Sequence, residues 1–532
     1  MIPVSDAWKE AQKGTLLPET FVEVTYTITE PGVQERATAT ANYSESFSNV
    51  AQIVGIEDRD SEAYATLDYG AWGLNGGYSY FNGSPINPGY VDTHYSEADC
   101  SVNVSPYPTI TITLPEQHNV LIPGVTITWS KAFGSWASSF RVTARDEEYS
   151  IIAQKTVTDN TDVTTRVWLD LIYYSEITIE VLKWSHPFQR IRCSDIRLGI
   201  GVVYTKTDLL GFEHRQSVDL LSAVLPQSNI TFKLRTDDDR WNPDNPTGAE
   251  KYLLEQQEIK VRYGMDIDGI TEWIKGGTFW LSEWDTPNNG LEANFTARDA
   301  IGFMGGKYTG PRSGSLYTIA EAALIEADLP MLGNGNARYV LDSSLKTVLT
   351  NFTENTQEFT IGEILQMVAH AGCCVFYQDR DGVVHIEPMS DNYSEYVIEP
   401  RICYTHPEYT INKPLKTLSV SYGEDSRLDI NVGTKGEIQT VDNPLIVTES
   451  NALVVGRKTE SVLENRKVIS GDFRADLRLD ALDNIVVRSK YASNVVRVTD
   501  VNYSTTSGAF KGTYTGRVVS TEMVPSAEGD LT

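Results

Sequence analysis

The chain is poor in the residues that several common protein classes require. Its 532 residues include only five cysteines, too few for a disulfide framework in so long a chain. No apolar run approaches the roughly 20 residues that span a bilayer, so we expect no membrane insertion. The opening MIPVSDAWKEAQKG has no apolar segment of the signal-peptide type, which predicts synthesis in the cytoplasm.

Basic residues are also scarce relative to acidic ones. The chain has 44 Lys and Arg against 72 Asp and Glu, for a formal net charge of −28. Proteins that grip nucleic acid place clusters of Lys and Arg against the phosphates, so this balance argues against such a surface. Two interpretations of the acidity stay open: ordinary solubility, or an acidic channel through which a polyanion passes without adhering.

Catalytic motifs are missing as well. H-E-x-x-H, G-x-S-x-G and the Walker A phosphate loop do not occur. Asp237 and Asp239, in RTDDDRWNPDNP, are candidates for a glycosidase-like acid pair, but the adjacent Asn and Pro residues favour a solvated loop. We therefore expect no enzyme activity, no catalytic residue and no cofactor.

The stretch AGCCVFYQDRDGVVHIEP is the strongest candidate for a metal or redox site. Thr360 and Glu363, just before it, match a capping box, and the helix they begin is expected to end at Gly372 with a positive φ. A hairpin around DRDG should follow. Because neighbouring side chains on a strand point to opposite faces, Cys373 and Cys374 cannot both reach one metal ion. The stretch therefore predicts scaffold and no metal site.

Most of the chain is β-forming sequence. Runs of Val, Ile, Thr and Tyr between Gly, Pro, Asn and Asp predict a mainly β, multi-domain fold with a smaller α+β part. LYTIAEAALIEAD and TIGEILQMVAHAG are the two helical patterns of that part. Between Gly55 and Ile200, short strands and frequent turn residues are typical of an inserted β-sandwich. The expected domains are a first β domain (1–55 and 201–312), the inserted β-sandwich (56–200), an α+β helix–hairpin domain (313–400) and a second β domain (401–532).

The insert carries the one plausible ligand surface. Sugar sites place an aromatic ring against the apolar face of a pyranose, while polar side chains bond its hydroxyls. DYGAWGLNGGYSY supplies Trp72, Tyr78 and Tyr80 in a Gly-rich segment, and KAFGSWASSF adds Trp136. Exposed aromatic residues on loops favour binding, whereas packing in the sandwich core is the alternative for any single Trp. These four residues are the candidate sugar-binding residues.

Several sequence segments, taken in order, resemble the hub proteins of phage tail tips. These hubs include the phage T4 baseplate-hub type and the N-terminal modules of tail-associated lysins. The segments are SVDLLSAVLPQSNITFKLRTDDDRWNPDN, IKGGTFWLSEWDT, FTARDAIGFM, GCCVFYQDRDGVVHIEP and GDFRADLRLDALDNIVVRS. In the insert, ATLDYGAWGLNG and ITIEVLKWSHPFQRIRCSDIRLGI are similar to galactose-binding-like jelly rolls. The resemblance thus implies hub-type β-barrel tube domains plus an inserted, carbohydrate-binding-like β-sandwich.

That resemblance also implies a function, as a structural virion protein of the tail tip or baseplate. Family hubs are homotrimers whose two β-barrel domains per chain form a pseudo-sixfold ring, which joins the sixfold tail tube to the threefold central spike. The implied partners are further copies of the chain, tail tube and distal tail proteins, the tape measure protein, and spike or tail fibre proteins. DNA would pass through the lumen during genome ejection without specific binding. The alternatives are an adhesin that binds host-surface glycan through the insert and, third, a glycan-cleaving tail enzyme.

Overall fold

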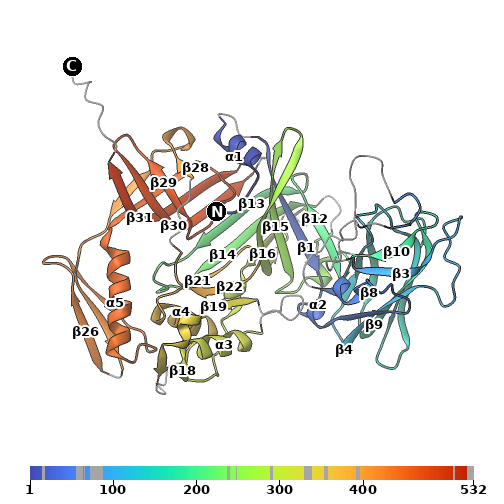
Figure 1. Ribbon diagram of the computed structural model, residues 1–532, viewed down its shortest axis with the longest axis horizontal. Coiled ribbons are helices and arrows are strands. Elements are labelled where there is room, and N and C mark those ends of the chain that lie inside the picture. Colours follow the sequence, from blue (N-terminus) through green and yellow to red (C-terminus); the bar gives the residue numbers. More distant parts are fainter. Residues whose placement is uncertain are drawn as a thin grey trace.

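Figure 1 shows the computed structural model: a β body, an inserted sandwich beside it, and a smaller part that contains the helices α3, α4 and α5. The fold is mainly β and divides into several sheets, which confirms the expected class. Among the residues that the structure describes, no helix is long and apolar enough to cross a membrane. The described residues are 1–14, 18–55, 64, 66–71, 88–236, 240–246, 248–287, 291–328, 338–352, 358–390, 396–423, 425–506 and 510–523.

One sheet of 13 strands runs through the body. Its order is β12-β1-β15-β16-β17-β14-β13-β30-β31-β28-β24, and β29 pairs with both β30 and β23. The strands are β1 (Thr20–Ile28), β12 (Ile200–Tyr204), β13 (Leu209–Ser217), β14 (Gln227–Arg235), β15 (Glu258–Ile267), β16 (Ile270–Asp285), β17 (Glu292–Arg298), β23 (Val397–Ile398), β24 (Glu408–Ile411), β28 (Lys467–Arg474), β29 (Asn484–Arg488), β30 (Ala492–Thr505) and β31 (Lys511–Met523).

The body has two halves, β1 with β12–β17 and β23–β24 with β28–β31, which meet edge to edge. Residues 212–217 of β13 pair antiparallel with residues 500–505 of β30. We call this junction the β13–β30 seam. The two halves also share one hydrophobic core, in which Tyr26 and Tyr263 of the first half join Tyr503 and Tyr514 of the second. The two β segments that the sequence analysis separates therefore pack as one unit.

The insert is a sandwich with a core of its own, built around Trp129, Phe140 and Trp184. Its sheets have the orders β2-β4-β9-β6-β7, β11-β5-β8 and β10-β3. Its elements are α2 (Val33–Arg36), β2 (Thr38–Ala41), η1 (Val50–Val54), β3 (Tyr90–Tyr95), β4 (Thr109–His118), β5 (Ile122–Thr128), β6 (Ala137–Arg145), β7 (Ile151–Val157), β8 (Thr164–Leu171), β9 (Tyr174–Trp184), β10 (Arg190–Cys193) and β11 (Asp195–Leu198).

The insert begins earlier than the expected residue 56. Val33 and Ile53 are buried in its core, and β2 pairs with β4. The chain therefore leaves the body after β1, near residue 30. TATA, the sequence of β2, is too short and too weakly apolar to show this from the sequence.

The third part combines helices with short sheets around a second core. Its elements are η4 (Ala300–Phe303), β18 (Ser313–Ser315), α3 (Leu316–Glu326), β19 (Tyr339–Leu341), η6 (Ser343–Lys346), β20 (Leu349–Asn351), α4 (Ile361–Ala371), β21 (Val375–Gln378), β22 (Val384–Glu387), β25 (Leu415–Tyr422), β26 (Ser426–Asn431), β27 (Glu437–Val441) and α5 (Glu449–Glu464). Outside these parts lie α1 (Asp6–Lys13), η2 (Glu250–Tyr252) and η7 (Pro400–Ile402).

Residues 415–464 belong to this third part, although the sequence analysis assigns them to the last β domain. Leu418, Val420 and Val455 lie in the same core as α3 and α4. No helix is predicted at α5 from the sequence, because the Val and Thr residues there are also typical of strands. Burial of Ala452 and Val455 against β25 and α4 stabilises the helix instead.

The helix–hairpin prediction is confirmed at its start and corrected at its end. Thr360 and Glu363 form the capping box. Gly372 has φ −86°, and the residue with positive φ is Cys373, at +55°. The turn glycine Gly382 has φ +79°, as DRDG predicts. The strand β21 begins only at Val375, and both neighbouring cysteines are free thiols.

Candidate functional site

Of the four predicted sugar-binding residues, the structure describes one. Trp72, Tyr78 and Tyr80 lie outside the described residues, as do Asp237 and Asp239. Trp136 is half-buried, and its indole Nε1 donates to the carbonyl oxygen of Asn160 at 2.8 Å. The fold therefore already uses the hydrogen-bonding group of this ring, and its contact with a sugar stays a prediction.

A buried carboxylate anchors the segment just before Trp72. Asp68 is 2% exposed and accepts hydrogen bonds from Arg190 Nη1 at 2.9 Å and Arg192 Nη2 at 2.6 Å. The Thr66 hydroxyl donates to it as well, at 2.7 Å. Burial by itself raises the pKa of Asp68, but Arg192 and the hydrogen bonds outweigh it and hold that pKa below its ordinary value. Residues 66–71 are thereby fixed against β10.

Exposed aromatic rings lie on Arg190 and on the chain segments next to it. The Arg190 guanidinium lies 4.3 Å from the ring centroid of Tyr95, and Tyr69 meets Phe188 edge-on at 6.2 Å. Tyr95, Tyr69 and Phe188 are 41%, 67% and 47% exposed. We call Tyr69, Tyr95, Phe188 and Arg190 the insert platform. The sequence does not reveal it, because its residues come from three separate segments. The pairing of β3 with β10 and the hydrogen bonds of Asp68 with Arg190 and Arg192 bring these segments together.

His94 is held in a defined orientation on the other face of β3. Asp92 is fully buried and accepts hydrogen bonds from the backbone N–H of His94 at 2.6 Å and from the Tyr90 hydroxyl at 2.6 Å. Its Oδ1 also lies 2.9 Å from His94 Nδ1, so Nε2 is left as the outward nitrogen. Among the described residues, no group of three or more His, Cys, Asp and Glu side chains could hold a metal ion.

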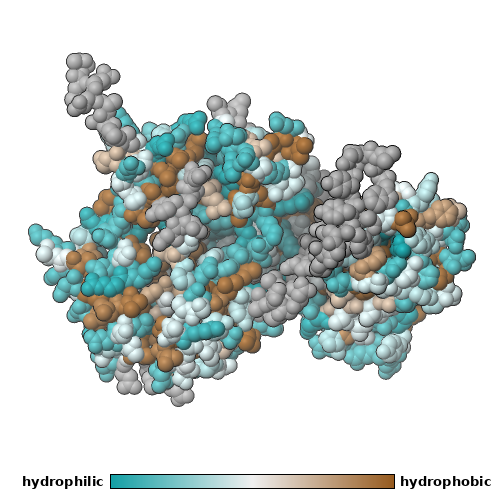
Figure 2. All heavy atoms as spheres, in the orientation of Figure 1, coloured by the Kyte–Doolittle hydropathy of each residue, from teal (hydrophilic) through white to brown (hydrophobic). Residues whose placement is uncertain are grey.

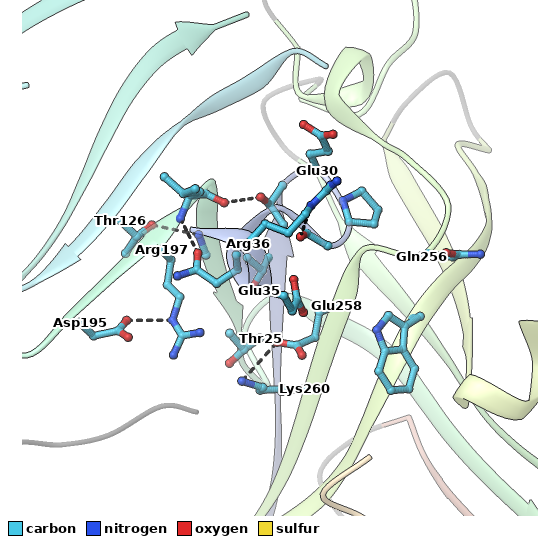
Figure 3. Close-up of a pocket in the computed structure, with 18 of the residues that line it drawn as sticks. Thr25, Glu30, Glu35, Arg36, Thr126, Asp195, Arg197, Gln256, Glu258 and Lys260 are labelled. Atoms are coloured by element: carbon cyan, nitrogen blue, oxygen red, sulfur yellow. Dashed lines mark hydrogen bonds and ion pairs between the residues drawn. The ribbon is translucent and has the colours of Figure 1, made fainter. Parts of the chain in front are cut away.

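A cleft of about 830 Å³ lies between the insert and the body (Figure 3). The hydroxyl-bearing residues Thr25 and Thr27 of β1 line the body side, and Thr126, Thr128 and Thr164 line the insert side. They face outward because the alternate residues of these strands pack into the two cores.

Charged residues also line this cleft. Arg197 donates to Asp195 at 2.9 Å, and Lys260 lies 3.2 Å from Glu258. Glu35 and Glu258 lie next to each other in Figure 3. Burial is the main cause that raises the pKa of Glu35, and the neighbouring Glu258 carboxylate raises it further.

The DRDG turn places a charged side chain in the body. Arg380 is 6% exposed; its Nε donates to Asp480 Oδ1 at 2.9 Å, and its Nη1 donates to the carbonyl oxygen of Lys275 at 2.6 Å. His214 lies beside this group and shares a 2.7 Å hydrogen bond with the Tyr263 hydroxyl. Burial, together with Arg380, lowers the pKa of His214 to about 3. The turn is therefore scaffold that ties both halves of the body together.

The sheet of the body ends in an exposed strand, β24. Among the described residues, β28 is the one strand with which it pairs, and all four of its residues are exposed. Tyr409 is 44% and Ile411 56% exposed. Figure 2 shows further hydrophobic residues on the surface over α5, where Leu453 and Val454 are 45% and 56% exposed. Unpaired strand edges and exposed apolar side chains are features of protein interfaces.

Comparison with known proteins finds similarity at the level of structure. No family model matches the chain, and no curated protein matches it. A tail protein of a Shewanella oneidensis prophage is 10% identical, covers 59% of this chain and 94% of its own, and has a TM-score of 0.39. A tail protein from Neisseria meningitidis is 8% identical, covers 59% and 93%, and has a TM-score of 0.43.

A carbohydrate-binding module is also among the structural neighbours. A family 32 carbohydrate-binding module from C. perfringens, solved with galactose, is 12% identical, covers 34% of this chain and 99% of its own, and has a TM-score of 0.20. Phage tail proteins and a carbohydrate-binding module are the classes that the sequence resemblance names. At these TM-scores and identities, the similarities carry no argument about function by themselves.

Proposed function

We propose that the chain is a structural component of a phage tail tip or baseplate, a homotrimeric hub that joins a sixfold tail tube to a threefold spike. It resides in the tail of the virion and forms part of the channel through which DNA leaves. The proposal assigns it no catalytic turnover. Its partners are tail tube and distal tail proteins, the tape measure protein, and spike or tail fibre proteins.

The observation that carries this proposal is the β13–β30 seam. It places two β units side by side within one chain, with one continuous sheet and one core across the junction. Three such chains supply six β units, which is the number that a threefold ring needs to match a sixfold tube. The order of the hub-like segments in the sequence supports the same arrangement.

The exposed strand β24 supports contact between copies. In a ring of identical subunits, the outer edge of each subunit contacts a different surface of the next one. Such heterologous contacts close into a ring only at the right angle, and otherwise they give open filaments. Tyr409 and Ile411 provide apolar area at that edge. At the opposite end of the sheet the insert covers β12, since Arg166 Nε donates to Gly201 O at 2.5 Å and Gly201 N donates to Thr126 Oγ1 at 3.2 Å.

The mass of the purified protein by light scattering, over a range of concentrations, tests the hub proposal. We expect a species of three times the 59.2 kDa chain mass, and a ring with a central channel by electron microscopy. A chain that stays monomeric at every concentration, alone and with a tail tube protein, contradicts the proposal.

A second candidate function is the binding of host-surface glycan through the insert. The insert platform favours it, because exposed aromatic rings beside an anchored arginine are suited to stacking on a sugar and bonding its hydroxyls. Glycan-array binding by the full chain tests it, with Tyr95→Ala and Phe188→Ala expected to weaken the signal. Tyr149→Ala, at a 72% exposed tyrosine of another turn of the insert, is the matched control. Equal binding by all three variants contradicts this candidate.

A further inference from the structure

The cleft between the insert and the body has the dimensions of a ligand site. Its volume of about 830 Å³ falls within the roughly 300–1,000 Å³ of small-molecule pockets. Its walls include β1 and β15 of the body, α2, β5, β8 and β11 of the insert, and the end of α3. It is separate from the insert platform, since none of the four platform residues lines it.

Hydroxyl groups face this cleft from the body side. Thr25 and Thr27 alternate along β1 with the core residues, so their side chains share the outer face, and Thr29, just after the strand, also lines the cleft. The Thr29 hydroxyl donates to the carbonyl oxygen of Leu198. In the described part of the chain, the hydroxyls of Thr25 and Thr27 make no hydrogen bond to protein atoms. Each can donate one hydrogen bond and accept others from a ligand.

Two of the carboxylates that line the cleft are already paired with cations. Asp195 is paired with Arg197, and Glu258 with Lys260. Arg338 Nη2 lies 3.5 Å from the same Glu258 carboxylate. A charged ligand would compete with these pairs, whereas an uncharged ligand can bond to their remaining donor and acceptor positions without breaking them.

Glu35 differs from these paired groups. Its carboxyl group forms no ion pair within the described ranges of the chain, and it lies next to Glu258 across the cleft. Because burial raises its pKa, the protonated form is favoured more than for an exposed glutamate. A protonated carboxyl group both donates and accepts hydrogen bonds, as a sugar hydroxyl does.

We propose that this cleft binds a neutral, hydroxyl-rich ligand, an oligosaccharide of roughly two or three units, contacted by Thr25, Thr27 and Glu35. The hydroxyls bond the ligand from β1, and Glu35 bonds it from α2 of the insert. A ligand held from both sides also fixes the insert against the body. This site is independent of the hub proposal, which the mass of the protein tests separately.

Ligand-observed NMR on the full chain tests the site, with lactose, chitotriose and maltotriose at about 10 mM as the probes. At least one probe is expected to bind with a millimolar dissociation constant. Thr25→Val/Thr27→Val keeps the side-chain shape but removes two hydrogen bonds, and should weaken that binding roughly tenfold. Thr38→Val/Thr40→Val, at exposed positions of β2 outside the cleft, is the matched control and should bind as the wild type does.

Three results overturn the proposal. The first is the absence of binding for every probe. The second is binding that the Thr25→Val/Thr27→Val variant, folded by circular dichroism, retains in full. The third is binding that Tyr95→Ala abolishes and the cleft variants leave intact, because the sugar then occupies the insert platform. Glu35→Leu gives a further check, since it should weaken binding while Glu35→Gln, which still donates and accepts, should retain most of it.

Discussion

Arg380, in the turn between β21 and β22, forms an ion pair with Asp480, which lies in the segment between β28 and β29 of the second half of the body. The arginine side chain is 5% exposed and the aspartate 25%. The same guanidinium donates to the carbonyl oxygens of Lys275, Leu477 and Leu479. One side chain therefore connects the helix–hairpin part, β16 and the C-terminal β strands.

Arg380→Leu should destabilise the chain by roughly 3 kcal/mol, because it removes the counter-charge of Asp480 and the hydrogen bonds that the guanidinium donates to three carbonyl groups. Urea unfolding followed by tryptophan fluorescence measures the change. Asp381→Asn is the control in the same turn: its ion pair with Lys275 joins side chains 54% and 72% exposed, so the loss should stay below about 1 kcal/mol. Equal effects of the two substitutions would contradict the role given to Arg380.

His214 should make the body less stable in mild acid. Burial lowers its pKa to about 3, whereas the unfolded chain takes up a proton near pH 6.5. Because the pKa of His214 is lower in the folded state than in the unfolded chain, the unfolded chain takes up the proton first. The folded state therefore loses stability as the pH falls below the unfolded-state pKa. Between pH 7 and pH 5 the loss from this group is roughly 2 kcal/mol.

The free energy of unfolding of His214→Gln at both pH values tests this. The variant should lose less stability than the wild type between pH 7 and pH 5, by roughly 2 kcal/mol. His406→Gln, at an exposed histidine, should follow the wild type. If His214→Gln shows the wild-type pH dependence, then protonation of another group accounts for the acid sensitivity.

Asp68→Asn should destabilise the insert. The substitution keeps the shape of the side chain but leaves Arg192, whose side chain is 3% exposed, without its counter-charge. A loss of roughly 3 kcal/mol is expected, seen as a lower melting temperature by calorimetry. Glu116→Gln, which removes an exposed ion pair with Arg36 in the same domain, should cost less than about 1 kcal/mol. A melting temperature no lower than that of Glu116→Gln would show that Asp68 does not anchor the insert.

Ile411→Lys should prevent assembly without unfolding the chain. A charge on the exposed edge of β24 opposes pairing with a second chain, and lysine is common on edge strands that stay unpaired. Light scattering should show a smaller species, while circular dichroism stays unchanged. Ile151→Lys is the matched control, because Ile151 is 58% exposed on the edge strand β7 of the insert and Ile411 is 56% exposed. Assembly by both variants alike would place the contact between copies elsewhere.

Local sequence determines much of this structure. Thr360 and Glu363 specify the start of α4, because the two hydrogen bonds of a capping box involve only neighbouring residues. The alternation in TFVEVTYTIT specifies which side chains of β1 are buried. The turn at Gly382 likewise needs only a residue that accepts a positive φ. The mainly β class and the presence of an insert follow from patterns of this kind.

Tertiary structure decides the rest, because it brings together residues that no local pattern connects. DRDG specifies a turn, but that Arg380 is buried against Asp480 depends on a segment 100 residues later. The platform needs β3 beside β10, and the cleft needs the insert beside β1. The pairing of β13 with β30 cannot be deduced from the sequence of either strand, since hydrogen bonds between backbones do not depend on which residues form them. It depends on which strand edges remain unpaired in the complete fold.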